Sequence, residues 1–377
     1  MVEWKKLGEV CEIKTGRGIT QKDCSEDGQY PVISGGQTPM GMYHQYNRES
    51  KTVTISRVGA YAGYVSFINE RFYLNDKCFS IIPFDNSVLN NKYLYSVLKG
   101  QEEIIQKLQS EGGVPTINTK KVGALSIPIP SLSEQQRIVS ILDTFTSSIS
   151  NLKQQIEERR KQYEYERDLL LDLEGKEGVE MKKLGEVFDT RNGYTPSTKN
   201  PDFWEEGTIP WFKMEDIRDN GRVLGDSNLH ITPKAIKGKG LFKANSIILA
   251  TSATIGEHAL ITVEHLSNQR FTNFYPKKKF EGLINMKFVY YYMYLIDEWC
   301  KQHINQGGFA SVDMNGLFSM DFPLLSLQAQ SRIVSILDTF EQSISNLEEQ
   351  LAMREKQYEY YRNQLLTFEG EEERGKT

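Results

Sequence analysis

The chain has 377 residues, of which 39% are hydrophobic and 11% aromatic, and this is enough for two folded domains with a connecting element. Its apolar runs are far shorter than the ~20 residues of a membrane-spanning helix, and its start has scattered charges in place of the apolar stretch of an export signal. We therefore expect a cytoplasmic protein with no membrane partner. A net charge of −5 argues against a protein that coats nucleic acid through clustered basic residues.

Residues 1–130 predict a first globular domain. Strand-like runs lie at 52–56, 64–68 and 79–83, and a helix-like run follows at 91–109. This order is typical of a mixed α/β domain. The segment is almost neutral, with 15 basic and 13 acidic residues.

Residues 131–177 predict one long helix. Ser131 and Glu134 have the spacing of a capping box and would begin it, and Gly175 would end it. About 40 residues would form a rod of roughly 60 Å. Its apolar residues are mostly three and four apart, as in a coiled-coil seam: Ile138, Leu142, Phe145, Ile149, Leu152, Ile156, Tyr163, Leu170 and Leu173.

Residues 178–325 predict a second mixed α/β domain. It opens by repeating the segment 5–10, Lys-Lys-Leu-Gly-Glu-Val, at 182–187. Strand-like runs at 246–251, 259–263 and 271–276 precede a helix-like run at 285–305. Three consecutive tyrosines at 290–292 and Trp299 lie in that run, and we interpret them as core or interface aromatics, not as a platform on which bases stack.

Residues 326–370 repeat the long helix, and a tail follows at 371–377. Every match to the first copy lies at an offset of 195, including an identical run at 138–145 and 333–340. The segments 5–10 and 182–187 match at an offset of only 177. The second half therefore has 18 more residues between this opening segment and its long helix. This is a duplication of a domain with its helix. Arg159 and Arg354 interrupt the two seams at equivalent places, and Gly370 would end the second helix.

One apolar stripe on so long a helix requires another to cover it, so we expect the two copies to pack against each other. The order of the elements favours an antiparallel pair that separates the domains. The predicted fold class is therefore α+β, with two mixed α/β domains and two long antiparallel helices that form a coiled coil.

Residues off the seam also match between the copies, although packing does not require this. An inert spacer left by a recent duplication would explain such matches, but the globular domains have diverged almost completely in the same chain. Two copies of one partner that dock on a pseudo-twofold surface would require them. Our candidates for partner docking are Arg137, Asp143 and Asn151 in the first copy, with Arg332, Asp338 and Asn346 in the second.

No pattern typical of a catalytic or metal site is present. Cys11, Cys24, Cys78 and Cys300 have neither disulfide-framework nor C-x-x-C spacing, and we expect thiols. The five histidines form no H-x-x-x-H or H-E-x-x-H pattern, and a phosphate-binding Walker A loop is absent. Residues 200–203, Asn-Pro-Asp-Phe, are similar to an amino-methyltransferase loop, but they lack its second proline and a preceding glycine-rich loop for S-adenosylmethionine.

The order domain, long helix, domain, long helix resembles the specificity subunits of type I restriction-modification systems. Short motifs resemble those of their target recognition domains. In the second half these are 193–197 (Gly-Tyr-Thr-Pro-Ser), Phe203-Trp204, Ile209-Pro210-Trp211, Asp216, 250–256 and Asn268-Gln269; in the first half, 16–20, 30–36 and 56–59 have the equivalent places. Gln135-x-Arg137-Ile138-Val139 is similar to the helix start of the family, and the resemblance extends to about Gly370.

The resemblance implies that each domain reads one half of a gapped, bipartite site on double-stranded DNA. The helices would set the gap and dock two modification subunits, and restriction and translocase subunits would complete the complex. S-adenosylmethionine and ATP with Mg²⁺ are expected on these partners, with no cofactor in this chain. Because base edges are read by Arg, Lys, Gln and Ser/Thr side chains from loops, our candidate DNA contacts are Arg17, Thr20, Ser34, Arg57, Thr195, Ser197, Lys213, Ser252, Gln269 and Arg270.

Two other classes of protein stay open at this point. A methyltransferase that acts alone would transfer methyl groups as a purified chain. A coiled-coil scaffold would explain the helices equally well, but it would show no preference between duplexes in a competition assay.

Overall fold

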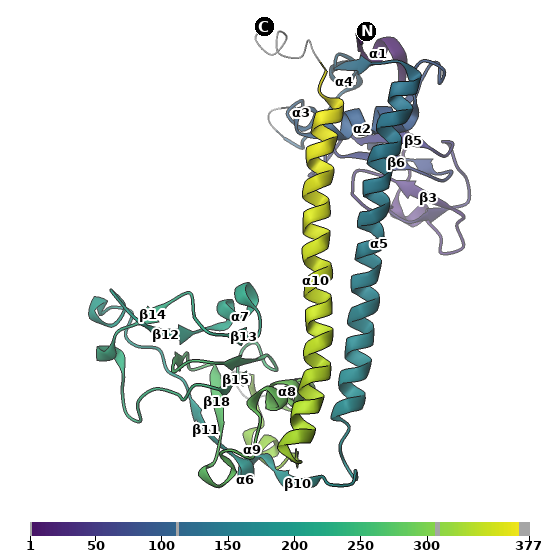
Figure 1. Cartoon of the computed structure of the whole chain (residues 1–377). Coiled ribbons are helices and arrows are strands. Elements are labelled where there is room, and N and C mark those ends of the chain that lie inside the picture. The colour runs from purple at the N-terminus through teal and green to yellow at the C-terminus, as the bar shows by residue number, and fades with distance from the viewer. Residues whose placement is uncertain (1, 111–112, 306–309, 369–377) are drawn as a thin grey trace. The chain divides into compact units, whose positions relative to one another are not determined.

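The computed structural model describes residues 2–110, 113–305 and 310–368, which form two compact units. Unit 1 contains residues 1–155 and 347–377, and unit 2 contains residues 156–346. Two long helices, α5 (Leu132–Leu171) and α10 (Leu327–Leu366), pass from one unit into the other (Figure 1). Each unit therefore consists of one globular domain and one half of each long helix.

The globular domain of unit 1 contains a four-stranded sheet in the order β2-β8-β5-β6, a three-stranded sheet β4-β3-β7 and a pair β1-β9. Helix α2 packs on β5 and β6. The strands are β1 (Glu3–Lys6), β2 (Cys11–Thr15), β3 (Tyr30–Ile33), β4 (Met42–Tyr43), β5 (Thr52–Ser56), β6 (Val65–Ile68), β7 (Tyr73–Leu74), β8 (Cys78–Pro83) and β9 (Ser126–Ile129); the helices are α1 (Leu7–Val10), α2 (Asn91–Gly100), α3 (Glu102–Gln106) and α4 (Thr119–Gly123).

The globular domain of unit 2 repeats this topology. Its sheets have the orders β11-β18-β15-β16-β13, β14-β12-β17, β10-β21 and β19-β20. The strands are β10 (Glu180–Lys183), β11 (Phe188–Asn192), β12 (Ile209–Phe212), β13 (Val223–Leu224), β14 (His230–Ile231), β15 (Ser246–Ala250), β16 (His258–Ile261), β17 (Leu266–Ser267), β18 (Phe271–Pro276), β19 (Ile304–Asn305), β20 (Ser311–Val312) and β21 (Asp321–Leu324); the helices are α6 (Leu184–Val187), α7 (Met214–Asn220), α8 (Met286–Gln302) and α9 (Met314–Phe318).

Most of the additional length of the second half lies in two connections. Residues 34–41 join β3 to β4, whereas 213–229 join β12 to β14 and include α7 and β13. Residues 44–51 join β4 to β5, whereas 232–245 join β14 to β15. The sheets of unit 1 thus recur in unit 2, which adds β13 to the large sheet and the pair β19-β20, and the connections that differ adjoin the three-stranded sheets.

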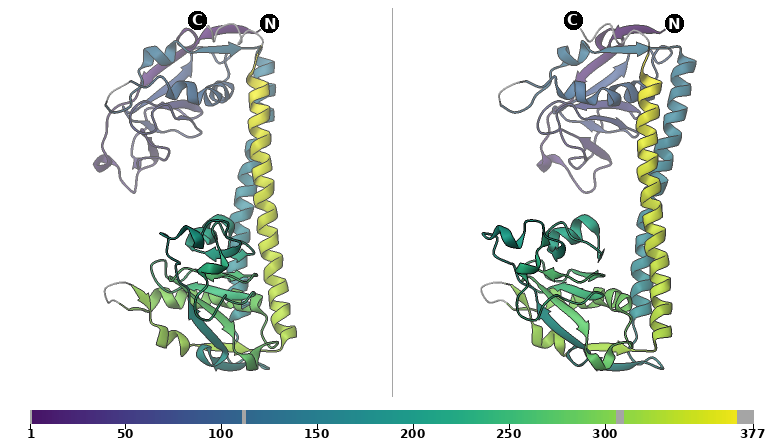
Figure 2. Two further views of the ribbon diagram at one scale, coloured as in Figure 1. Left: turned by 90° about the vertical axis from the view of Figure 1, so that its left-hand side faces the viewer. Right: turned by 60° about the vertical axis from the view of Figure 1, so that its left-hand side comes forward.

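The long helices pair in antiparallel fashion within each unit. In unit 1, Phe145 stacks on Tyr361 with ring centroids 5.3 Å apart, and Lys153, further along α5, forms an ion pair with Glu355, which lies earlier in α10. In unit 2, Tyr163 of α5 contacts Phe340 of α10. Figure 1 and the right-hand view of Figure 2 show the two helices running side by side within each unit. The predicted fold class is confirmed.

The arginines that interrupt the seams stack on aromatic rings across the pair. The guanidinium of Arg354 lies 5.7 Å from the Phe145 ring in unit 1, and that of Arg159 lies 5.9 Å from the Phe340 ring in unit 2. Such cation–π contacts keep a charged side chain in an otherwise apolar seam. Arg159 and Arg354, which interrupt the two seams, therefore make equivalent contacts in the two units.

A buried glutamine fastens each long helix to its own globular domain. Gln135 donates through Nε2 to the carbonyls of Val88 and Pro130, and its Oε1 accepts from the backbone N–H of Asn90. Gln330 makes the same three bonds in unit 2, with the carbonyls of Leu283 and Leu325 and the N–H of Asn285. All of these positions differ by 195, so the equivalence of the two halves extends back into the globular domains.

The hydrophobic cores include residues of the long helices. Ile138 and Leu142 of α5 are buried in the core of unit 1, against which Tyr358 and Leu365 of α10 also pack. In unit 2 the core contains Ile333, Val334 and Leu337 of α10 with Tyr163 and Leu171 of α5. Tyr290, Tyr291 and Tyr292 are buried there too, as expected from the sequence.

Several element boundaries differ from the sequence predictions. The run at 91–109 is two helices separated at Gln101, because Gly100 is a poor residue for a helix interior. Helix α5 ends at Leu171, four residues before Gly175, which has a φ of 71° in the following turn. Ser131 caps α5 through a bond from the Glu134 N–H, but the Glu134 carboxylate bonds to Arg137 and leaves the capping box half-formed. Gly370 and the predicted tail at 371–377 lie outside the described residues.

The cysteines are free thiols. Cys11, Cys78 and Cys300 are buried and Cys24 is partly buried. Burial raises the pKa of the Cys11 thiol to about 12, which keeps it protonated and unreactive at neutral pH. In the part of the chain that the structure describes, no helix has both the length and the apolar character needed to cross a membrane.

Candidate nucleic-acid interface

In unit 1 the loops that carry the predicted DNA contacts meet at Asn75, in the turn between β7 and β8. The Asn75 side chain is almost fully buried, donates through Nδ2 to the carbonyl of Ile19 and accepts through Oδ1 from the N–H of Lys77. Its backbone N–H donates to the carbonyl of Ile33 at 2.9 Å. One residue therefore holds together the loop after β2, the end of β3 and its own turn.

The loop after β2 lies directly against this turn. The N–H of Arg17 donates to the carbonyl of Leu74 at 3.0 Å. A Cβ on Gly16 would collide with the carbonyl oxygens of Leu74 and Asn75, so only glycine permits this approach.

The four residues predicted in unit 1 lie in these loops, but they differ in exposure. Arg17 is exposed, whereas Ser34 is buried, with only 8% of its surface accessible. Thr20 caps a short 3-10 turn and bonds to Asp23 through both its N–H and its hydroxyl; these bonds, the one from the N–H foremost, lower the pKa of Asp23. Arg57 is partly buried and donates through Nη1 to the carbonyl of Asp76. Arg17 and Thr20 are thus the exposed side chains of the four, and the Thr20 hydroxyl is already bonded to Asp23.

Unit 2 repeats the arrangement around Asn268. The N–H of Asn268 donates to the carbonyl of Phe212, its Oδ1 accepts from the N–H of Arg270, and Tyr194 donates to the carbonyl of Ser267. Gly193 approaches this turn as Gly16 does in unit 1, and a Cβ there would collide with two backbone carbonyls.

The structure gathers most of the residues predicted in unit 2 around this turn. Thr195 donates to Gln269 at 2.5 Å, which joins two exposed candidates from different loops. Arg270 is exposed, and its carbonyl accepts from the N–H of Thr251, the residue before Ser252. Lys213 follows Phe212 directly and is partly buried. Ser197 is exposed at the end of the loop, where its carbonyl accepts from the Trp204 indole.

Two residues of the unit 1 site, Asn75 and Lys77, were not predicted from the sequence. The N–H of Arg57 donates to the carbonyl of Lys77, as that of Thr251 donates to Arg270, so Lys77 is the counterpart of Arg270. Lys77 is exposed. The shared pattern Asn-x-Lys/Arg at 75–77 and 268–270 could have revealed the pair, but it is short.

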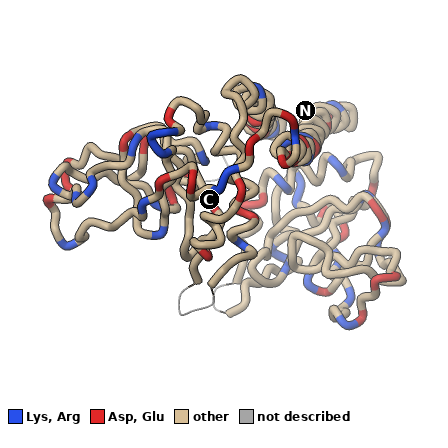
Figure 3. The backbone as a smooth tube through the Cα atoms, turned by 90° about the horizontal axis from the view of Figure 1, so that it is seen from below, with Lys and Arg blue, Asp and Glu red and all other residues tan. Residues whose placement is uncertain are grey.

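The surface of each globular domain carries both signs of charge. Figure 3 shows Lys and Arg positions interspersed with Asp and Glu along the chain. Neither domain is uniformly positive. Any positive charge at the candidate DNA-contacting loops therefore comes from individual basic residues in those loops.

The long helices present a second candidate surface. Eight pairs of matched helix residues are exposed in both copies and have one member in each unit, and the two helices exchange roles between the units. Unit 1 presents Arg137, Ser140, Thr144 and Asn151 from α5 with Lys356, Gln357, Glu359 and Tyr360 from α10; unit 2 presents Arg332, Ser335, Thr339 and Asn346 from α10 with Lys161, Gln162, Glu164 and Tyr165 from α5. We call these sixteen residues the matched helix surface.

Asp143 and Asp338, two of the docking candidates, contact their own globular domains. Asp143 forms an ion pair with Lys92 at 2.6 Å, and Asp338 forms one with Lys287 at 2.8 Å. Tyr291 also donates to Asp338. These ion pairs attach each long helix to its own domain. They explain why aspartate occurs at both positions without any contact to a partner protein.

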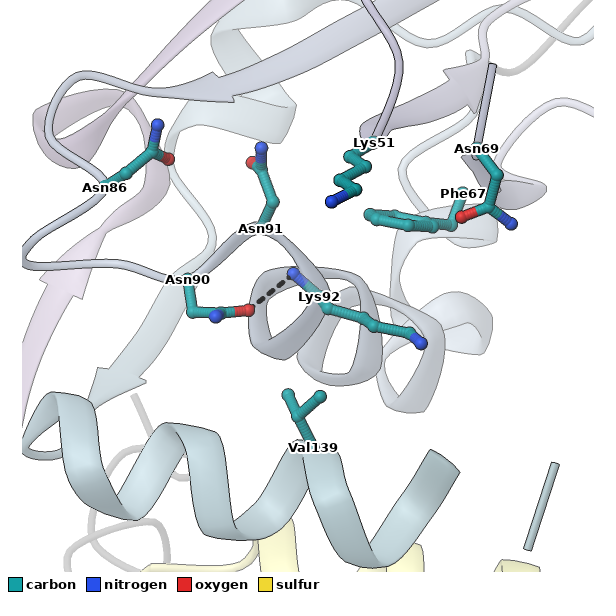
Figure 4. Close-up of a pocket in the computed structure, with 8 residues that line it drawn as sticks. All are labelled: Lys51, Phe67, Asn69, Asn86, Asn90, Asn91, Lys92 and Val139. Atoms are coloured by element: carbon teal, nitrogen blue, oxygen red, sulfur yellow. Dashed lines mark hydrogen bonds between the residues drawn. The ribbon is translucent and has the colours of Figure 1, made fainter. Parts of the chain in front are cut away.

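A groove of about 450 Å³ lies beside the matched helix surface in unit 1. Figure 4 shows Asn90, Asn91 and Lys92 at the start of α2, above Val139 of α5. A second hollow shares Asn90 and Val139 with this groove and continues along α5 past Ser140 and Thr144. The described residues contain no cluster of three potential metal ligands.

Comparison with known proteins identifies the family. The model of the type I restriction modification DNA specificity domain matches residues 1–159 and again residues 176–353. The chain belongs to the specificity subunits of type I restriction-modification systems. Such subunits are non-catalytic and recognise DNA sequence for their enzyme, so this chain is a recognition subunit.

The relatives agree with this assignment. The chain is 48% identical to the specificity subunit of the Escherichia coli enzyme EcoprrI, in a match of 209 residues that covers 52% of each protein. It is 31% identical to the EcoR124I/EcoR124II specificity subunit of Escherichia coli, over 97% of this chain and 94% of that one. The fold is similar to that of the S subunit from M. genitalium, with a TM-score of 0.63, 19% identity and coverage of 98% and 96%.

Proposed function

We propose that each globular domain of this specificity subunit reads one half of a bipartite, gapped DNA site. The linking helix would serve as the spacer, and the matched helix surface would dock two modification subunits. The observation that carries this proposal is the repetition of one loop assembly, around Asn75 and Asn268, with different exposed side chains in each unit.

The exposed side chains at these loops suit readout of bases. Arg17 and Lys77 in unit 1 and Arg270 in unit 2 can donate to the major-groove edge of guanine, whereas Gln269 can bond to adenine. Asn75 is buried and Asn268 is partly buried, and both hold the loops through hydrogen bonds to backbone groups, so the exposed side chains can vary while the support stays similar. Two domains with one scaffold and different contacts would read two different half-sites.

The matched helix surface suits docking of two copies of one partner. Its residues are exposed in both units, so the packing within this chain does not account for their repetition. An identical partner that binds twice needs the same contacts twice. We infer that these partners are modification subunits carrying S-adenosylmethionine, and that restriction and translocase subunits with ATP and Mg²⁺ join them.

The first test is co-purification of the full chain with a candidate modification subunit, mass determination of the complex and selection from a randomised duplex library. We expect two modification subunits per chain and enrichment of a split motif. Enrichment of no motif, even with the partner present, would favour a scaffold that does not recognise DNA.

A second test assigns the half-sites. Arg17→Ala should relax the preference in one half of the motif and Arg270→Ala in the other, each with a loss of about 1–3 kcal/mol of discrimination. Lys22→Ala, a change of an exposed residue in the 3-10 turn at 21–23, is the control and should leave both halves unchanged. A single variant that loses the preference in both halves of the motif would contradict the assignment of one half-site to each domain.

A third test addresses docking. Tyr165→Ala and Tyr360→Ala remove the aromatic residues of the matched helix surface, which are 68% and 57% exposed and therefore contribute little to folding. Each variant should lose one of the two modification subunits in mass measurements. Met353→Ala, an exposed residue of α10 whose counterpart Glu158 differs, is the control.

A further inference from the structure

The connection between β14 and β15 in unit 2 is a basic loop with no counterpart of its length in unit 1. Residues 230–245 contain four lysines, at 234, 237, 239 and 243, and no acidic residue. The equivalent connection in unit 1 is residues 44–51, six residues shorter than 232–245. The bridge from Arg48 to Phe72 corresponds to that from Phe242 to His265, so the additional residues lie before Phe242.

Two of the four lysines are neutralised by carboxylates. Lys234 forms an ion pair with Asp202 at 3.2 Å, and Lys243 forms one with Glu281 at 2.6 Å. Lys237 and Lys239 are exposed, and neither has a carboxylate within 4 Å among the residues that the structure describes. Gly238 and Gly240 have φ values of 60° and 78°, and they turn the chain tightly around these two lysines.

The tip of this loop is fixed to the candidate DNA-contacting loop. The N–H of Lys237 donates to the hydroxyl of Tyr194 at 2.8 Å, and that hydroxyl donates to the carbonyl of Ala235. Tyr194 immediately precedes Thr195. On the other side, Arg191 donates to the carbonyl of Gly240 at 2.9 Å. The backbone that carries these two lysines is therefore held next to the loop with Thr195 and Ser197.

A small hydrophobic cluster makes this placement rigid. Ala235 and Phe242 are buried with Trp211, and Tyr194 and Leu241 pack against them. The Trp211 indole donates to the carbonyl of Tyr194 at 3.0 Å. Both loops rest on one cluster, so their relative position is set within unit 2.

We propose that Lys237 and Lys239 form a phosphate-contacting site that binds the backbone of double-stranded DNA beside the half-site read by unit 2. The inference rests on the proposed function, because it takes the loop at 193–197 as the one that approaches bases. A major groove is about 12 Å wide, so backbone phosphates flank any loop that enters it. Lysine is suited to this contact because its ammonium binds phosphate as a point charge and carries no base preference.

Binding of the full chain, with its modification subunit where the two co-purify, to a random-sequence duplex over a series of salt concentrations tests this site. Each phosphate contact contributes about 0.9 to the slope of log K against log salt. The double variant Lys237→Gln/Lys239→Gln should therefore reduce that slope by about 2, whereas Lys237→Arg/Lys239→Arg should retain it. Library selection should return the same motif for all of these variants.

The ion-paired lysines of the same loop supply a control of equal charge. Lys234→Gln/Lys243→Gln changes the net charge by the same amount, and we expect a much smaller change of slope. An unchanged slope in the first double variant, or an equal decrease in the control, would overturn the proposed site. Weaker docking of the modification subunit with an unchanged slope would also overturn it and would assign the loop to an acidic protein surface.

These outcomes are distinct from a failure of the proposed function. A wild-type chain that shows no preference between duplexes would contradict sequence recognition. The salt slope on random DNA is measured without any preferred sequence.

Discussion

The buried amide of Asn75 bonds to the Ile19 carbonyl and the Lys77 N–H, and both groups would lose their partner in Asn75→Ala. A buried polar group without a partner costs about 1–3 kcal/mol. We expect a decrease of that size in the free energy of unfolding, measured with denaturant, together with weaker preference in one half of the DNA motif. Asp76→Ala changes an exposed side chain in the same turn and should alter stability by less than about 0.5 kcal/mol.

His265 makes unit 2 sensitive to acid. Its ring is fully buried, Nδ1 bonds to the carbonyl of Val263, and Nε2 bonds to the Asn273 amide. Burial lowers the pKa of His265 from 6.5 to about 4, so the unfolded chain takes up the proton first as the pH falls. This contribution to stability is complete above pH 6.5 and decreases by up to about 3 kcal/mol as the pH falls towards 4.

The first unit supplies the control for this prediction, because Phe72 occupies the position of His265 in the equivalent bridge, and Ser80 is the counterpart of Asn273. The double variant His265→Phe/Asn273→Ser should show a shallower decrease in stability between pH 6.5 and 4, measured by denaturant unfolding at several pH values. An identical pH profile in wild type and variant would show that other groups dominate.

At the residue scale, the sequence predicted the loops better than the side chains within them. Arg17, Thr195, Gln269 and Arg270 are exposed at the two turns. The buried Ser34 shows why the rest is harder to predict, since exposure depends on the packing of neighbouring loops. Asn75 and Lys77 were missed because their pattern is only three residues long.

At the scale of elements, one buried glutamine contributes three hydrogen bonds to the contact between each long helix and its domain. Gln135→Ala would leave the carbonyls of Val88 and Pro130 and the N–H of Asn90 without this partner. We expect a loss of about 2–3 kcal/mol in the free energy of unfolding. The adjacent Gln136 is exposed, so Gln136→Ala is a matched control and should be almost neutral. Equal effects of both changes would contradict this role of Gln135.

The helices and central strands were predictable because their patterns are strong. The run at 52–56 coincides with β5, and 271–276 coincides with β18. The break between α2 and α3 at Gln101 was not predicted, because the amphipathic pattern of the side chains continues through Gly100. The backbone alone departs from helical geometry there. The two-residue strands β4, β7, β14 and β17 depend on tertiary pairing and have no periodicity to detect.

At the scale of the whole molecule, the repeat in the sequence suggests a boundary after each long helix, whereas the compact units divide both helices in the middle. The duplication is visible in the sequence as contiguous halves. The units are not contiguous, because α10 returns to unit 1 and completes a core that begins at the other end of the chain. The antiparallel pairing of the helices creates these non-contiguous units. Because the pairing joins residues far apart in the sequence, no local sequence pattern reveals it.

The division of the chain into two compact units predicts which fragment folds by itself. Residues 2–130 lack Ile138 and Leu142, each buried in the core of unit 1 and worth about 1.5–3 kcal/mol, as well as Tyr358 and Leu365. That loss is a large share of the ~5–15 kcal/mol that stabilises a typical domain. By contrast, residues 2–155 joined through a short linker to 347–368 retain all four. In urea unfolding followed by circular dichroism, we expect one cooperative transition for the joined fragment and a much lower midpoint, or no transition, for residues 2–130. Equal midpoints would mean that the globular domain is complete without the helices, and that Gln135 and the helix residues of the core only position it.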